Sequence, residues 1–169
     1  MKNSLVKVAA ILAVFLGLAG FVNAQVKDAM PERISVKPLL SSGLPVSVEF
    51  VAVTQIENDS LVTYSIANKD AQKLDEVEIL LIVFKADGNA RGGEGWRQSL
   101  SLAKDADVDF SRKMKTKVMP GDRVVFLLHK AKGQTGEWET NSTKIIEAAK
   151  AFIAGNNYTL PEAHFIKTK

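Results

Sequence analysis

The sequence contains no cysteine, and this absence excludes several kinds of structure and chemistry. A chain without cysteine has no disulfide framework and no cysteine nucleophile. It also has no cysteine at a cleavage site on which a lipid anchor is built. The fold must therefore be held by its hydrophobic core, and a chain of 169 residues is long enough to bury one.

A strong excess of one charge is also missing. The chain carries 22 Lys and Arg against 19 Asp and Glu. Two of the basic residues, Lys2 and Lys7, fall in the signal peptide that we predict below, so the remainder has 20 basic residues against 19 acidic ones. Binding to nucleic acid needs a concentrated positive surface. The composition therefore argues against nucleic acid as a partner.

Familiar catalytic and metal-binding motifs do not occur. The sequence has no Gly-x-Ser-x-Gly, no His-Glu-x-x-His and no phosphate-binding loop with Gly-Lys-Ser/Thr. Residues 105–109 alternate Asp like the start of a calcium loop, but Phe110 and Thr116 stand where that loop requires Gly and Glu. His129 and His164 lack the local spacing of zinc ligands. We therefore predict no catalytic residue, no metal ligand and no cofactor.

The first 24 residues have the three parts of a secretory signal peptide. A basic start (residues 1–7) precedes fourteen apolar or small residues (8–21), and Val22 and Ala24 are the small residues before a cleavage site. A membrane-spanning helix needs about 20 apolar residues, so an uncleaved anchor is the weaker alternative. We expect cleavage after Ala24, export to the periplasm or medium of a bacterium, and no membrane span in the mature protein.

From residue 46 onward the pattern favours β-strands. Residues 46–52 and 61–68 alternate apolar and polar side chains around the turn residues 57–60, which predicts a hairpin. Residues 77–84 (VEILLIVF) and 124–129 (VVFLLH) are apolar at nearly every position. Such runs are typical of central strands that are covered on both faces.

The period changes near the C-terminus. The apolar residues between Ile145 and Ile153 fall on one side of a helix, which Asn141 or Ser142 can cap and Gly155 can end. The predicted organisation is a signal peptide (1–24), a linker or edge strand that includes the alternating residues 34–36 (25–45), a β-sandwich (46–140), a helix packed on the sandwich (141–155) and a tail (156–169).

Several of these segments resemble a bacterial immunoglobulin-like pattern. Residues 61–68 (LVTYSIAN), the strand 77–84 followed by Asp87-Gly88, and Pro120-Gly121-Asp122 before the next strand carry the resemblance, over about residues 46–133. Domains of the FxLYD type are the nearest comparison, although the stretch that would hold their motif reads LIVFKADG here (residues 81–88). The resemblance implies an antiparallel immunoglobulin-like β-sandwich and supplies no catalytic residues.

Residues 87–97 (DGNARGGEGWR) are the first candidate binding surface. They read as a glycine-rich loop in which Arg91, Trp96 and Arg97 are the candidate recognition residues, because Trp and Arg often anchor interfaces. The alternative is a plain connection whose Trp96 folds onto the core.

Lys113, Lys115 and Lys117 are the second candidate. They lie on one face of an extended segment and form a basic face that suits an anionic polymer. The alternative is that the lysine row protects an exposed edge strand from pairing with other chains.

These observations lead to an expected function. We expect an exported, non-catalytic binding or accessory module of the bacterial cell envelope, with another envelope protein or a polysaccharide as its partner. A structural envelope protein and a hydrolase are the alternatives. A hydrolase would need His129 or His164 within hydrogen-bond reach of a serine and an acid.

Overall fold

The computed structural model describes residues 32–34, 36–56 and 58–167. The predicted signal peptide therefore lies outside the described residues. Within the described ranges the elements are β1 (Glu32–Ile34), β2 (Val36–Leu40), β3 (Val46–Ile56), β4 (Asp59–Asn68), β5 (Leu74–Phe84), β6 (Ala90–Leu102), β7 (Asp107–Lys113), β8 (Arg123–Gly133), β9 (Gly136–Glu139), α2 (Ser142–Ile153) and β10 (His164–Lys167).

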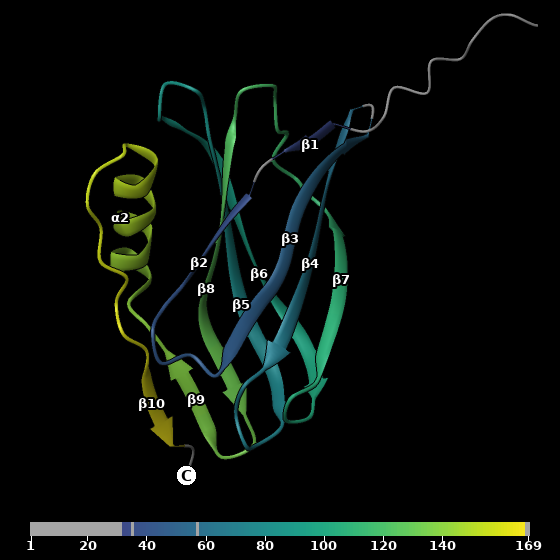
Figure 1. The fold of residues 1–169 in the computed structure, drawn as a ribbon, viewed down its shortest axis with the longest axis vertical. Coiled ribbons are helices and arrows are strands. Elements are labelled where there is room, and N and C mark those ends of the chain that lie inside the picture. Colours follow the sequence, from purple (N-terminus) through teal and green to yellow (C-terminus); the bar gives the residue numbers. More distant parts are fainter. Residues whose placement is uncertain (1–31, 35, 57, 168–169) are drawn as a thin grey trace, which may run out of the picture. The chain divides into compact units, whose positions relative to one another are not determined.

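The strands form two sheets (Figure 1). Sheet A has the order β1-β3-β4-β7, and sheet B has the order β10-β9-β8-β5-β6 with β2 added in parallel to β8. The order β3-β4-β7 opposite β6-β5-β8-β9 matches the A-B-E and C′-C-F-G strands of immunoglobulin-like sandwiches. The prediction of a mainly antiparallel β-sandwich with one C-terminal helix is confirmed.

The main core lies between the two sheets. Val62, Tyr64 and Ile66, which the alternating pattern placed on one face of β4, are completely buried there. They pack with inward side chains of sheet B such as Leu81 and Phe126. The period-2 pattern of the sequence thus identifies the core side of β4 correctly.

A second core lies on the other face of sheet B, where α2 covers it. Ile145, Ala149 and Ile153 of the helix pack against outward side chains of β5 and β8, including Ile82 and Leu127. Because these two strands are covered on both faces there, residues 77–84 and 124–129 are apolar at nearly every position, as predicted. The helix begins after Asn141, whose Oδ1 accepts the Lys144 N–H at 3.0 Å, and Gly155 follows it with φ +73°.

Residues 34–36 do not form one short edge strand. β1 pairs with β3 in sheet A, whereas β2 pairs with β8 in sheet B, so the chain changes sheet near position 35. Position 35 itself lies outside the described residues. The prolines of this region favoured an edge strand and did not indicate the second pairing, because a local pattern does not show which distant strand a segment pairs with.

The glycine-rich segment is a strand and not a loop. The turn is limited to residues 85–89, where the Lys85 N–H donates to the Asn89 carbonyl, and β6 then pairs with β5 from Ala90 to Leu102. A Cβ on Gly93 would lie 3.2 Å from the Leu81 carbonyl oxygen. Glycine here permits a close approach of two strands, and the expectation of a glycine-rich loop over residues 87–97 was wrong.

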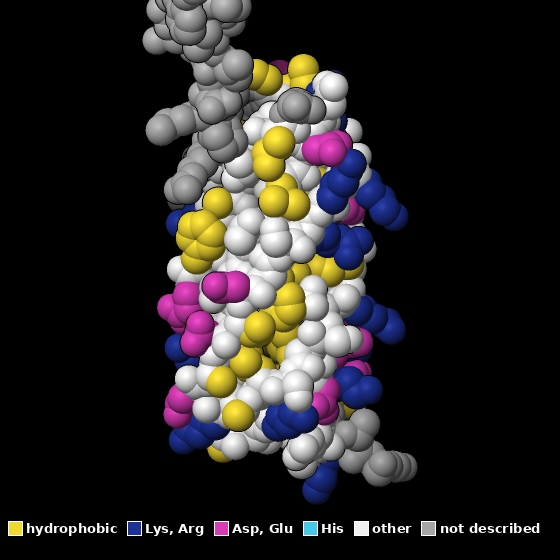
Figure 2. Space-filling model, turned by 90° about the vertical axis from the view of Figure 1, so that its right-hand side faces the viewer, with side chains coloured by type: hydrophobic (Ala, Val, Ile, Leu, Met, Phe, Trp, Pro, Cys, Tyr) yellow, Lys and Arg dark blue, Asp and Glu magenta, His cyan; other side chains and the backbone are white. Residues whose placement is uncertain are grey.

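No described element covers the outer face of sheet A. Figure 2 shows this face, with hydrophobic side chains in its middle and Lys and Arg side chains along one border. Phe50 and Ile56 of β3 are about half exposed, at 48% and 50%. Among the described helical residues, none forms a helix long and apolar enough to cross a membrane.

Candidate functional site

Trp96 is part of the core and not of a binding surface. Its side chain is only 9% exposed, and its Nε1–H donates to the Tyr64 hydroxyl at 3.1 Å. Its ring lies 6.3 Å from that of Phe126 and 5.0 Å from the Arg112 guanidinium. The recognition hypothesis required an exposed Trp96, so the structure corrects this prediction in favour of the alternative.

The two arginines of the same segment are occupied by different carboxylates. Arg91 donates from Nε and Nη2 to both oxygens of Asp122, at 2.6 and 2.9 Å. This pairing lowers the pKa of Asp122 and raises that of Arg91. Arg97 donates to Glu78 at 2.8 Å. Arg91, Trp96 and Arg97 therefore do not form one surface.

The predicted basic face, in contrast, gathers around one pocket. Lys113, Lys115 and Lys117 line a pocket of about 400 Å³ together with Met114 and the turn residues 58–60. The structure thus brings the three lysines together around one cavity.

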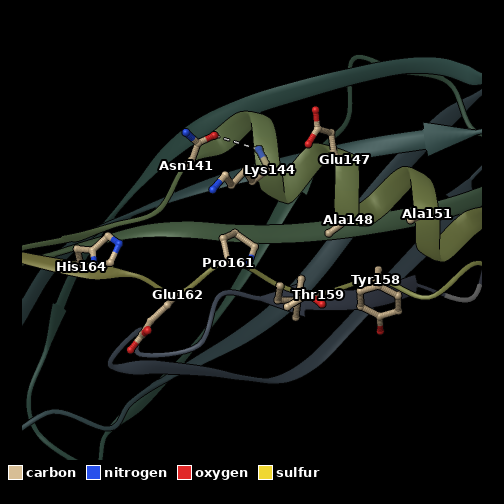
Figure 3. A pocket seen from close by; sticks show the side chains of 11 residues that line it. Asn141, Lys144, Glu147, Ala148, Ala151, Tyr158, Thr159, Pro161, Glu162 and His164 are labelled. Carbon is tan, nitrogen blue, oxygen red and sulfur yellow. Dashed lines mark hydrogen bonds between the residues drawn. The ribbon is translucent and has the colours of Figure 1, made fainter.

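A groove of about 740 Å³ lies between α2 and residues 158–164. We call it the helix groove. Figure 3 shows the helix on one side and the C-terminal segment on the other, with Asn141, Lys144 and His164 at one end and Tyr158 at the other. The residues that line it are Asn141, Lys144, Glu147, Ala148, Ala151, Tyr158, Thr159, Leu160, Pro161, Glu162 and His164.

Local interactions fix both walls of the helix groove. Burial of the opposite side of α2 on sheet B holds the helix wall. On the other wall, the Ala163 N–H donates to the Ser42 carbonyl at 2.7 Å, and the Thr140 hydroxyl donates to the Glu162 carbonyl at 3.3 Å. The groove stays open because Ala148 and Ala151, with their small side chains, face it from the helix.

Most polar side chains of the helix groove have no partner. Within the described part of the chain, no hydrogen bond or ion pair engages the side-chain ends of Lys144, Glu147, Tyr158, Thr159, Glu162 or His164. Ammonium, carboxylate, hydroxyl and imidazole groups thus line one groove and, being exposed to solvent, can exchange bound water for a ligand. Such an arrangement suits a ligand that offers many donors and acceptors.

His129 shows part of what a hydrolase needs. Its Nε2 lies 3.6 Å from Glu78 Oε2, and Ser142 lines the same pocket of about 370 Å³. Burial lowers the pKa of His129, although Glu78 and Glu139 act in the opposite direction. Its Nδ1 is buried without a partner, and no serine hydroxyl among the described residues is hydrogen-bonded to the ring. Glu78 is thus near His129, but Ser142 makes no hydrogen bond to the imidazole ring.

The helix groove could not be predicted from the sequence, for a physical reason. Its residues come from a lateral helix face and from an irregular segment, so no periodicity or motif marks them. The described residues also contain no group of three or more His, Asp and Glu placed to hold a metal ion. Comparison with models of known families and with curated proteins finds no match for this chain.

Proposed function

We propose that the protein is an exported, non-catalytic binding module of the bacterial cell envelope and that its ligand binds in the helix groove. The observation that carries this proposal is the set of unpartnered polar side chains on one concave surface. Some charged side chains elsewhere are paired within the protein, as Arg91 is with Asp122 and Lys130 with Glu137.

A polysaccharide fits the chemistry of the helix groove better than an apolar peptide. Sugars present many hydroxyls, which match alternating donors and acceptors such as Lys144, Glu147 and Thr159. They also present C–H faces, against which an aromatic ring packs, and Tyr158 is 39% exposed and supported edge-on by Phe152. The lining contains both signs of charge, so a neutral or mixed-charge glycan is the expected class.

The test is binding to purified peptidoglycan sacculi and to a neutral soluble glucan. Ala151→Trp fills the helix groove from the helix side. Lys150→Trp is the control, because it places the same ring on the preceding residue, which does not line the groove. We expect Ala151→Trp to abolish co-sedimentation with the glycan and Lys150→Trp to retain it. Equal binding by both variants would remove the groove as the site. Binding only to envelope proteins would make the partner a protein.

Export has a separate test. The signal-peptide pattern of residues 1–24 supports cleavage after Ala24. N-terminal sequencing of the protein recovered from the periplasm or medium is expected to begin at Gln25. A membrane-bound form that retains Met1 would contradict export with cleavage.

One observation favours a structural role as the second candidate. Phe50 and Ile56 are exposed on the uncovered face of sheet A, and an apolar patch of this kind can support self-association. Under this alternative, sedimentation velocity would show concentration-dependent assembly that Phe50→Ser and Ile56→Ser together abolish. Under the binding-module proposal, the wild type stays monomeric at the same concentrations.

A further inference from the structure

The pocket formed by Lys113, Lys115 and Lys117 is built on a fixed backbone. The Met114 N–H donates to the Ser60 carbonyl at 2.8 Å, and the Val118 N–H donates to the Ser60 hydroxyl at 3.2 Å. Between them, the N–H groups of residues 115 and 116 both donate to Glu94 Oε1. The three lysines therefore project from a segment that is tied to β4 and β6, and their convergence does not depend on a flexible loop.

Edge protection explains only the first of the three lysines. β7 is an edge strand of sheet A and ends at Lys113. Lys115 and Lys117 lie beyond its end, on the segment already bonded to Ser60 and Glu94. No free strand edge is left there for them to guard, so a second reason is needed for placing them around one cavity.

The charge of this pocket is not balanced. Asp59 pairs with Lys113 at 2.6 Å, and no other described carboxylate lines the pocket. Lys115 and Lys117 have no ion-pair partner among the described residues. Like charges that share a pocket repel each other, and an anion bound between them removes that repulsion.

We propose that this pocket binds a phosphate group. Lysine ammonium groups act as compact point charges and suit a tetrahedral, multiply charged anion, whereas a planar carboxylate is better matched by the arginine fork. Lys115 and Lys117 contact the phosphate oxygens, and Lys113 contributes when Asp59 releases it. The site shares no residue with the helix groove, so it goes beyond the proposed glycan binding and does not depend on it.

The test is a titration with inorganic phosphate and with pyrophosphate. The backbone NMR shifts of residues 58–60 and 113–117 report binding, and sodium chloride is added to keep the ionic strength constant. Lys115→Gln with Lys117→Gln is expected to weaken binding by about tenfold or more. The control variant, Lys104→Gln with Lys132→Gln, has the same change in net charge at exposed positions outside the pocket and is expected to bind within about twofold of wild type. Asp59→Asn removes the competing carboxylate and is expected to bind more tightly.

Co-sedimentation with vesicles distinguishes the two sources of the phosphate group. Binding to vesicles that contain phosphatidylglycerol, but not to phosphatidylcholine alone, assigns the site to a lipid headgroup. Binding to pyrophosphate without vesicle binding assigns it to a soluble phosphate compound. The proposal is overturned if the control variant loses as much affinity as the pocket variant, or if chloride at equal ionic strength produces the same shifts.

Discussion

Residues 87–97 and the helix groove differ in whether their polar side chains have partners within the protein. In the first segment, Arg91 is held by Asp122, Trp96 donates to Tyr64, and Arg97 donates to Glu78. In the helix groove, side chains of the same polarity have no partner among the described residues. The segment that most resembled a binding site in the sequence is the one whose Trp and Arg side chains already bind other residues of the protein.

This difference shows that residue type alone does not mark a binding site. Trp and Arg are frequent at interfaces, but they are equally useful inside a sandwich, where a ring fills volume and a guanidinium pairs with a carboxylate. A side chain is available for a ligand only when the fold leaves it unsatisfied.

Trp96→Ala is expected to have the largest effect on stability. Removing a buried aromatic ring leaves a cavity, and the typical cost is about 3–5 kcal/mol of unfolding free energy. Urea denaturation measures the change. Arg97→Ala on the same strand is the control and is expected to stay within about 0.5 kcal/mol, because Arg97 is largely exposed. An unchanged denaturation midpoint for Trp96→Ala would contradict the burial of this ring in the core.

Ile145→Ala tests whether the helix wall is part of the folded monomer. Ile145 is completely buried against sheet B, so we expect a loss of about 2–5 kcal/mol. Phe152 is only partly buried and contacts Tyr158, so Phe152→Ala is expected to cost less than Ile145→Ala. Thermal unfolding compares the two variants. A change of association state without loss of stability would mean that the helix packs on a partner instead.

Arg91→Ala leaves the buried Asp122 carboxylate without its guanidinium. The variant is therefore expected to be less stable than wild type at pH 7. The hydrogen bond from Arg91 is the main cause of the lowered pKa of Asp122, so its stabilising contribution is complete above the usual carboxyl pKa and disappears as pH falls through the lowered one. In denaturation at stepped pH, the difference between wild type and variant is therefore expected to begin shrinking near the usual carboxyl pKa of about 4 and to vanish only below the lowered pKa of Asp122. A gap that is independent of pH would contradict this assignment.

Lys144→Ala with His164→Ala is expected to change stability by less than about 0.5 kcal/mol, because neither side chain has a partner to lose. The same variant is expected to weaken glycan binding. Denaturation and co-sedimentation together separate the two effects. A marked loss of stability would show that these side chains serve the fold, and the contrast with residues 87–97 would fail.

The sequence predicted those features that depend on local periodicity. The hairpin of β3 and β4, the doubly covered strands β5 and β8, and α2 each follow from the spacing of apolar residues. Residues 98–102 were a weak strand candidate, but the first part of β6 was missed because Gly92, Gly93 and Gly95 have low strand propensity, although their small size is what lets neighbouring atoms approach.

The candidate sites could be predicted only where one segment carries the whole pattern. The lysine row was visible because its members alternate along one stretch of chain. The helix groove requires the chain to turn back after Gly155 and to attach to Ser42, a contact between residues far apart in the sequence. No local pattern encodes such a contact.

The change of sheet between β1 and β2 has a consequence for the order of folding. β2 pairs in parallel with β8, so Val36 must find Val124 before the strand is fixed. Contacts of such long sequence separation are slow to form, because a large loop has to close first. The hairpins β3–β4 and β5–β6 close over short loops and have no such delay. β2 is therefore expected to pair with β8 last, after the rest of the sandwich has formed.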